Sequence, residues 1–387
     1  MNPPSNLDLA EIIQSSTAAA GLPNVPPDML EALRILTESW NQEGHLTTAG
    51  AAGKRAGLIR ALTNRMRLED TLARHPEITA EPIAGPIVII GLPRSGTTKL
   101  HRIIAADPEM QKLLLWQLLN PVPLPNTPPK GPDPRIAMAD AYTHALRTNA
   151  PDLYAAHPMA TFEPDEDVFA LEVTGYNYIN CSTVPAPSYK AWLDQQSFAG
   201  VYRWLKLFLQ VQQYSGHAQG RPWVLKAPQH MGFLPDLFSV FPNATIVHCH
   251  RAPEITVASY IAMISSARRA SCSIADPADV GRYAINFWGG LTRRYLTDRA
   301  ALAANHNFID LAYNTIVEDS IGCADRIYAA ANLPLSQSSR DTMLAWEQSN
   351  TQHKHGKHTY NLTDANLTTA DIAREFEGYI RMFGDYF

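Results

Sequence analysis

The stretch that most constrains this chain runs over residues 86–108, PIVIIGLPRSGTTKLHRIIAADP. Four apolar β-forming residues, 87–90, lead into a turn that contains Gly91 and Gly96, and a helical pattern with one apolar face follows. Glycines let backbone N–H groups turn inward, and the unpaired amides of a helix start carry partial positive charge. This order of elements therefore indicates an α/β fold with an anion site.

The loop also carries its own cation. Gly91 and Gly96 have the spacing of the nucleoside-triphosphatase loop G-x-x-x-x-G-K-[ST], but Thr97 stands where the lysine belongs. Arg94 supplies the charge from inside the loop, in a fork that suits phosphate or sulfate oxygens, and Thr97 and Thr98 add hydroxyl donors. A tight turn without a ligand is the alternative, and the full GLPRSGTT sequence favours the phosphate-type ligand.

Three further strands are predicted from apolar runs, at 223–226, 244–250 and 308–313. A helical pattern over 234–241 links the second strand of the chain to the third. Such a βαβ crossover implies a parallel sheet with helices on its faces.

Polar side chains follow the ends of these strands. Arg94, Lys226, His230 and Arg251 each lie just after a strand end. Since parallel strands place their carboxyl ends at one edge of the sheet, we expect these four residues to converge there on a ligand.

The rest of the chain divides by composition. Residues 1–80 show helical apolar stripes and are predicted to form a helical N-terminal extension to a main domain over 81–387. Residues 120–135 are too rich in proline for a helix or a central strand. Residues 136–220 are mainly helical in pattern and rich in aromatic residues. Most of these aromatics are expected in the core, and a minority could line an apolar pocket.

Composition excludes several classes of protein. The net charge of −5 argues against broad electrostatic binding of nucleic acid. The N-terminus lacks the pattern of a signal peptide, and no apolar run is long enough for a membrane span. The four cysteines have no CxxC spacing, so neither a disulfide framework nor a zinc site is indicated. These features predict a reduced, cytoplasmic protein and leave its oligomeric state open, a homo-oligomer included.

Several motifs in the same order resemble one family. GLPRSGTT, LKAPQH, FPNATIVHCHRAPEITVASY and HKHGKHTYNL are similar to segments of the sulfotransferases that use 3′-phosphoadenosine 5′-phosphosulfate (PAPS), in their bacterial form with a helical N-terminal extension. The resemblance implies a P-loop-like three-layer α/β fold with a central, mostly parallel sheet. It also implies transfer of a sulfuryl group to a hydroxyl of a small organic or lipid-like acceptor, with PAP as the other product and no metal required. Residues 120–220 would then form the acceptor side.

The resemblance also implies roles for individual residues. The 5′-phosphosulfate would be held by the glycine loop through Arg94, Ser95, Gly96, Thr97 and Thr98. The 3′-phosphate would be held by Arg251 and Ser259. The basic loop that closes the nucleotide pocket would contain His355, Gly356 and Lys357.

Catalysis needs donors for the leaving phosphate oxygen and a base for the acceptor proton. Arg94 and Lys226 suit the first role. For the base, His230 is the first choice, although a histidine that caps the next helix explains it equally well. Acids in the segment TFEPDEDVF are the alternatives, namely Glu163, Glu166 and Asp167, and Glu166 falls where relatives often carry an acid.

One departure from the family keeps other functions open. Relatives often have Trp-Glu after the first helix, whereas this chain has Trp116-Gln117, and glutamine cannot act as a base. The departure supports a PAP-binding protein without catalysis. An atypical P-loop kinase would need an acid for Mg²⁺ at the end of the second strand, where this chain has Lys226.

Other clusters have simpler explanations. The spacing of His353, His355 and His358 does not favour a metal site, and His248 and His250 are expected to form a packed or hydrogen-bonded pair. Two arginine pairs suggest solvated helix faces, with one member free to contact the nucleotide: Arg268 with Arg269, and Arg293 with Arg294.

Overall fold

The computed structural model describes residues 6–125, 127, 131–216, 218, 220–350 and 361–387. In this part of the chain one parallel sheet has the strand order β2-β1-β3-β4. Its strands are β1 (Ile87–Ile90), β2 (Val224–Lys226), β3 (Thr245–His250) and β4 (Asn307–Ala312). The predicted parallel α/β sheet is confirmed, and the strand ends differ from the prediction by no more than one residue.

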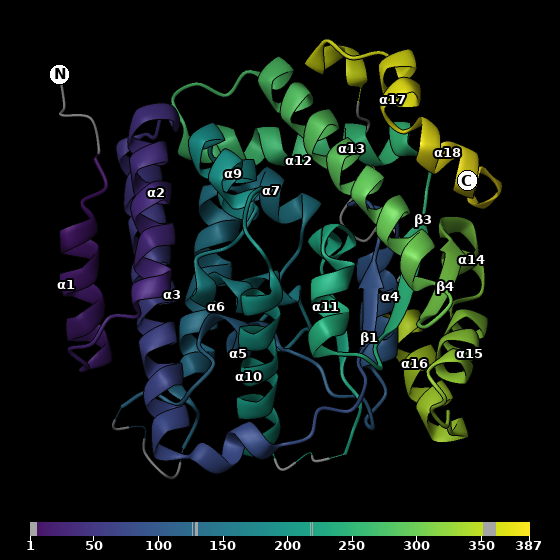
Figure 1. The fold of residues 1–387 in the computed structure, drawn as a ribbon, viewed down its shortest axis with the longest axis horizontal. Helices are drawn as coiled ribbons and strands as arrows, with labels where there is room; N and C mark the ends of the chain where they lie inside the picture. The colour runs from purple at the N-terminus through teal and green to yellow at the C-terminus, as the bar shows by residue number, and fades with distance from the viewer. Residues whose placement is uncertain (1–5, 126, 128–130, 217, 219, 351–360) are drawn as a thin grey trace.

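Strand β1 is buried on both faces, and its side chains enter two separate cores. Ile87 and Ile89 pack with α4 (Thr97–Ala105) and α15 (Ser320–Ala330). Val88 and Ile90 belong to the larger core on the other face. That core contains residues of α10 (Ala199–Gly216), α11 (Leu234–Val240) and α13 (Pro277–Leu302). The alternation of β1 residues between two helical layers gives the three-layer arrangement (Figure 1).

The remaining elements surround these layers. The chain begins with α1 (Leu9–Ala20), α2 (Pro27–Glu43), α3 (Thr48–Arg74) and the 3₁₀ helix η1 (Pro76–Ala80). The middle of the chain adds α5 (Leu115–Leu119), α6 (Pro134–Asn149), α7 (Pro151–Ala156), η2 (Asp167–Thr174), α8 (Ile179–Thr183), α9 (Pro187–Leu193) and η3 (Pro228–Gly232). The C-terminal part adds α12 (Pro253–Ser271), α14 (Tyr313–Glu318), α16 (Gln337–Ser349), η4 (Leu362–Ala365), α17 (Thr369–Glu375), α18 (Glu377–Phe383) and η5 (Gly384–Tyr386).

The proline-rich segment differs slightly from the prediction. Helix α6 begins at Pro134, inside the stretch 120–135 that was expected to exclude helix. Proline is tolerated in the first helical turn, and the Asp133 side chain caps the helix by accepting a hydrogen bond from the backbone N–H of Arg135. Among the described helices, none is both long enough and apolar enough to cross a bilayer.

A buried arginine fastens the N-terminal helices to the rest of the chain. Arg65 of α3 has a side chain that is only 3% exposed, and its guanidinium binds both carboxylate oxygens of Asp28 at 2.8 and 2.9 Å. The same group donates to the carbonyl oxygen of Val173 at 3.0 Å and lies 3.7 Å from the ring centre of Trp204. Arg65 thus joins α3 to α2, η2 and α10. Helices α2 and α3 lie side by side in Figure 1.

Substitution of Arg65 tests this anchor. We expect Arg65→Met to lower the free energy of unfolding by about 2 kcal/mol, because charged hydrogen bonds and a cation–π contact are lost together. Arg55→Met is the control, since Arg55 pairs with Glu11 on the exposed surface and such pairs contribute less than about 1 kcal/mol. Urea unfolding of both variants measures the difference, and equal effects would contradict the anchor.

Candidate anion-binding and catalytic site

The loop after β1 has a backbone that only particular residues can adopt. Gly91 and Gly96 have φ angles of +150° and +91°, and a Cβ on Gly91 would lie 2.5 Å from the carbonyl oxygen of Cys249. Arg94 also has a positive φ, +72°, which is strained for a residue with a side chain. The buried hydroxyl of Ser95 has no hydrogen-bond partner among the described residues. A strained turn with an unsatisfied hydroxyl at a helix start suits an oxyanion.

Two arginines meet at this loop. Arg94 donates from Nη1 to the carbonyl oxygen of Ala156 at 2.7 Å, and Arg251 donates from Nη1 to the carbonyl oxygen of Arg94 at 3.0 Å. The Arg251 guanidinium lies 3.9 Å from the ring centre of Tyr313, beside a cavity of about 140 Å³. Burial lowers the pKa of Arg251, and the nearby charge of Arg94 lowers it as well. Neither arginine forms an ion pair with a described carboxylate, so a bound anion would relieve their repulsion.

Lys226 lies at the end of β2 and faces the start of α4. Its side chain is 1% exposed, and its Nζ is 2.6 Å from Glu166 Oε1 and 3.4 Å from Thr98 Oγ1. The Glu166 side chain is 18% exposed. The structure therefore brings the predicted Lys226, Glu166 and Thr98 together, with the carboxylate accessible and the ammonium buried.

The acidic segment 163–167 lies along this edge of the sheet, and each of its acids has a cationic or histidine partner. These pairs are Glu163 with Arg102 (3.6 Å), Asp165 with His157 (3.2 Å), Glu166 with Lys226 (2.6 Å) and Asp167 with His230 (3.0 Å). Sequence reasoning missed His157, Asp165 and Arg102. The density of acids was a usable signal, but the partners come from separate elements and share no spacing.

His230 has a different setting from the one expected of a base. Its ring is fully buried, its Nε2 lies 3.0 and 3.1 Å from the two carboxylate oxygens of Asp167, and its Nδ1 lies 2.9 Å from the Tyr202 hydroxyl. Both ring nitrogens are therefore engaged inside the core. This geometry disfavours the first choice of His230 as base and favours a structural role for it within η3.

The other predicted residues divide into three groups. Ser259 lies on α12, about two helical turns past Arg251, and is buried. Gln117, at the family's Trp-Glu position, caps α5, because its Oε1 accepts from the backbone N–H of Leu114 at 3.0 Å. Several predicted residues lie outside the described part of the chain: His353, His355, Gly356, Lys357 and His358.

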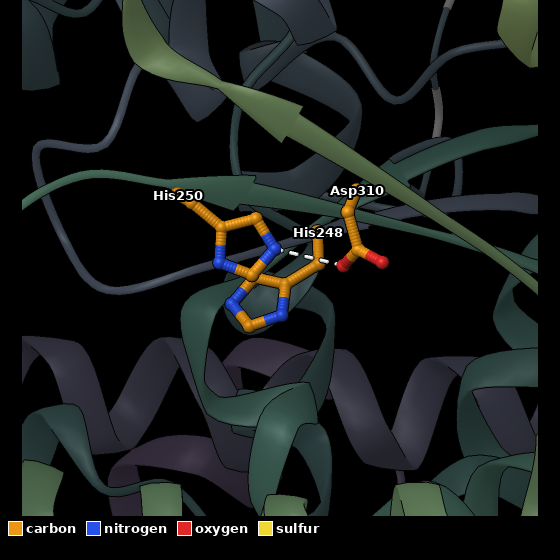
Figure 2. A group of neighbouring side chains, drawn as sticks. All are labelled: His248, His250 and Asp310. Atoms are coloured by element: carbon orange, nitrogen blue, oxygen red, sulfur yellow. Dashed lines mark hydrogen bonds and ion pairs between the residues drawn. The ribbon is translucent and has the colours of Figure 1, made fainter. Parts of the chain in front are cut away.

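His248 and His250 form a buried network with Asp310 across β3 and β4 (Figure 2). One ligand-type atom from each of the three lies within 4.8 Å of the others, which would suit a metal. However, His250 Nε2 is 2.8 Å from Asp310 Oδ1, and Arg299 binds both oxygens of Asp310 at 2.6 and 2.5 Å. His248 Nδ1 is 2.7 Å from the hydroxyl of Tyr295. The guanidinium charge opposes a cation here, and the network instead fixes the end of β3 that carries Arg251.

The arginine pairs were only partly predicted. Arg269 is exposed, but Arg268 is buried with 4% exposure, so the expectation of a solvated face is wrong for Arg268. Arg293 and Arg294 are both exposed, as expected; Arg293 pairs with Glu375, and Arg294 donates to the carbonyl oxygen of Gly232 at 3.1 Å. Residue-to-residue spacing on a helix does not reveal which faces other elements cover.

A buried histidine beside the site makes stability depend on pH. Burial, with the charge of Lys226 nearby, lowers the pKa of His101 on α4 to about 3. The unfolded chain takes up this proton below about pH 6.5 and the folded chain does not, so stability falls as pH falls from about 6.5 towards 3. The limiting slope is about 1.4 kcal/mol per pH unit for one group.

We expect His101→Asn to flatten the decline of the melting temperature between pH 7.5 and 5. The control is His144→Asn, because His144 is exposed. Thermal unfolding across this pH range measures both, and an unchanged slope in His101→Asn would contradict the assignment.

This chain is similar in sequence and in fold to known sulfotransferases. A model of the sulfotransferase family matches residues 86–337. The crystal structure of sulfotransferase STF1 from Mycobacterium tuberculosis H37Rv is similar with a TM-score of 0.84 and 27% identity, over 97% of this chain and 100% of that one. Sulfotransferase STF9 from Mycobacterium avium shares the fold with a TM-score of 0.85 and 23% identity, over 97% and 96% of the two chains. No curated protein matches the sequence of this chain.

Proposed function

Because the chain belongs to the sulfotransferase family, we propose that it transfers the sulfuryl group of PAPS to a hydroxyl of a small organic or lipid-like acceptor. The observation that carries this proposal is the pair of arginines at the glycine loop. The Arg251 side chain donates a hydrogen bond to the carbonyl oxygen of Arg94, and neither guanidinium pairs with a described carboxylate. Two uncompensated guanidiniums at a helix start fit a ligand with more than one anionic group.

The residues at the glycine loop and the start of α12 support this donor. We assign the 5′-phosphosulfate to the loop residues 94–98, where the Ser95 hydroxyl has no other described partner. We assign the 3′-phosphate to Arg251 and Ser259. The lowered pKa of Arg251 supports this assignment, because an anion beside it would restore the favourable environment of the charged form. The closing loop around Gly356 stays a prediction.

PAPS, when bound, supplies a sulfuryl group whose bond to the bridging phosphate oxygen breaks as the acceptor oxygen bonds to sulfur. Arg94 and Lys226 are assigned to stabilise the charge left on that phosphate oxygen, since such pre-oriented donors contribute most to catalysis of this kind. Thr98, 3.4 Å from Lys226 Nζ, positions the ammonium toward the loop. No metal is needed in this scheme.

We assign the general base to Glu166. It is the described carboxylate paired with Lys226, and it is partly exposed, so an acceptor hydroxyl can reach it. His230 has no ring nitrogen left for this task. Glu166 would take the acceptor proton, while Lys226 holds the carboxylate at the edge of the sheet.

The acceptor side is proposed to come from residues 120–220 of a catalytic domain over 81–387. Phe162 is 62% exposed and lies next to Glu163 in the acidic segment. An exposed aromatic ring in the segment that carries the assigned base supports an apolar or aromatic alcohol as the acceptor.

Calorimetric titration with PAP and with AMP, which lacks the 3′-phosphate, tests the donor site. We expect tight binding of PAP and weak binding of AMP. Arg251→Ala should weaken PAP by about 10- to 100-fold, the value of a charged hydrogen bond, and leave AMP nearly unchanged.

Equal losses for both nucleotides would refute the 3′-phosphate assignment, and no preference for PAP would refute the proposed function. Binding of PAP without transfer to any acceptor in a screen with PAPS would favour the non-catalytic alternative.

Substitution of Glu166 and of Glu163 tests which of the two carboxylates is the general base. Glu166→Gln should lower kcat by about 10²- to 10⁴-fold with the Kd for PAP unchanged, because the proton acceptor alone is removed. Glu163→Gln is the matched control, since Glu163 pairs with Arg102 in the same segment, and its kcat should change only a few-fold. The reverse order of effects would move the base to Glu163.

A further inference from the structure

A cavity of about 260 Å³ lies far from the glycine loop. It is formed where the end of α2 meets α8 and the start of α9 on one side and the end of α12 and the start of α13 on the other. Arg268 lines it from the last turns of α12, fifteen residues past Pro253 and so about 22 Å along the helix from the end that adjoins Arg251. The cavity is therefore separate from the site assigned to the nucleotide.

Arg268 is a buried charge without an anionic partner. It is 4% exposed, its Nε donates to the carbonyl oxygen of Ser182 at 2.9 Å, and its guanidinium lies 5.3 Å from the ring centre of Tyr283. In the described part of the chain no carboxylate pairs with it, and no acceptor takes its two terminal nitrogens. Arg268 lines the cavity, so its guanidinium offers a permanent positive charge to an anion bound there.

The acids that line the cavity are each engaged elsewhere. The Asp276 side chain caps α13 through the backbone N–H of Ala278 at 3.0 Å. Glu43 accepts hydrogen bonds from the side chains of Ser39 and Ser188. Asp279 pairs with Arg282. Lys190 is likewise neutralised by Asp194 at 2.6 Å.

Arg268 is therefore the cation of the lining without a described ion pair, whereas Glu43 and Asp276 keep their negative charges because their hydrogen-bond donors are neutral. The nearby acids at the same time disfavour a ligand that carries more than one negative charge.

We propose that this cavity binds a small organic monoanion, a carboxylate or a sulfate ester with a compact apolar body. The anionic group would take the two terminal nitrogens of Arg268 in a forked geometry. The apolar body would lie against Tyr283, Ile274 and the segment 185–187, which supply most of the remaining lining. The volume is below the usual range for drug-sized ligands and limits the body to about one ring.

A ligand bound in this cavity would contact both the N-terminal helices and the long helices that follow β3. The lining comes from both parts of the chain, so a bound ligand stabilises the folded state by mass action. This inference does not depend on the identity of the nucleotide at the glycine loop.

Thermal unfolding of the full chain with benzoate and with phenyl sulfate tests the site, and benzamide is the uncharged control. We expect both anions to raise the melting temperature in a saturable manner and benzamide to leave it unchanged. The two anions distinguish a carboxylate site from one selective for sulfate esters. Saturating PAP should not displace either anion, and displacement would overturn the proposal.

Substitutions of the lining residues test whether the anion binds in this cavity. Arg268→Gln should weaken benzoate by at least about tenfold, and Arg269→Gln, the exposed neighbour with the same change in charge, should leave its affinity unchanged. Ile274→Glu tests the same site should Arg268→Gln fail to fold, because Ile274 is 53% exposed and a carboxylate there repels the anion. No response of the wild-type chain to either anion, or full retention of affinity in Arg268→Gln and Ile274→Glu, would overturn the proposal.

Discussion

The parallel pairing of β1 with both of its neighbours is the constraint on which the candidate site depends. Ile89 lies opposite Lys226 on one side and opposite Val247 on the other, so all three strands end at the same edge. Each of these strands is buried on both faces, so a shift of register would move Lys226, His248 and His250 away from the partners that satisfy them. The core thus holds Lys226 beside the last residues of β1, and His250, which precedes Arg251, beside the start of the glycine loop.

At the edge of the sheet where the strands end, some cations have carboxylate partners and others have none. The acidic segment 163–167 neutralises Lys226, Arg102 and two histidines, whereas the arginines at the loop have no described carboxylate. The uncompensated positive charge at this edge is therefore concentrated at the glycine loop, where it attracts an oxyanion, and Lys226 faces that loop through Thr98. Arg268 is likewise a cation without a described carboxylate partner, and it lies in another part of the fold.

Histidines show why residue type alone did not assign roles. His230, His248 and His250 all follow or end strands, the positions where catalytic groups gather. All three are buried. His230 and His250 each bind a tyrosine and an aspartate through their two ring nitrogens, and His248 binds Tyr295 through Nδ1. A hydrogen-bonded core histidine and a catalytic histidine have the same local sequence, and they differ only in which distant partners reach the ring.

The sequence by itself determined the strand–loop–helix unit and the parallel sheet, because strand periodicity, glycine spacing and the geometry of βαβ units act over short stretches. From the same patterns it predicted that Arg94, Lys226, His230 and Arg251 follow strand ends at one edge of the sheet. Only the tertiary structure decided that Glu166 meets Lys226, that His230 is enclosed and that Arg268 is buried beside a cavity. Burial and pairing depend on elements that are distant along the chain, and no local pattern encodes which of them will touch.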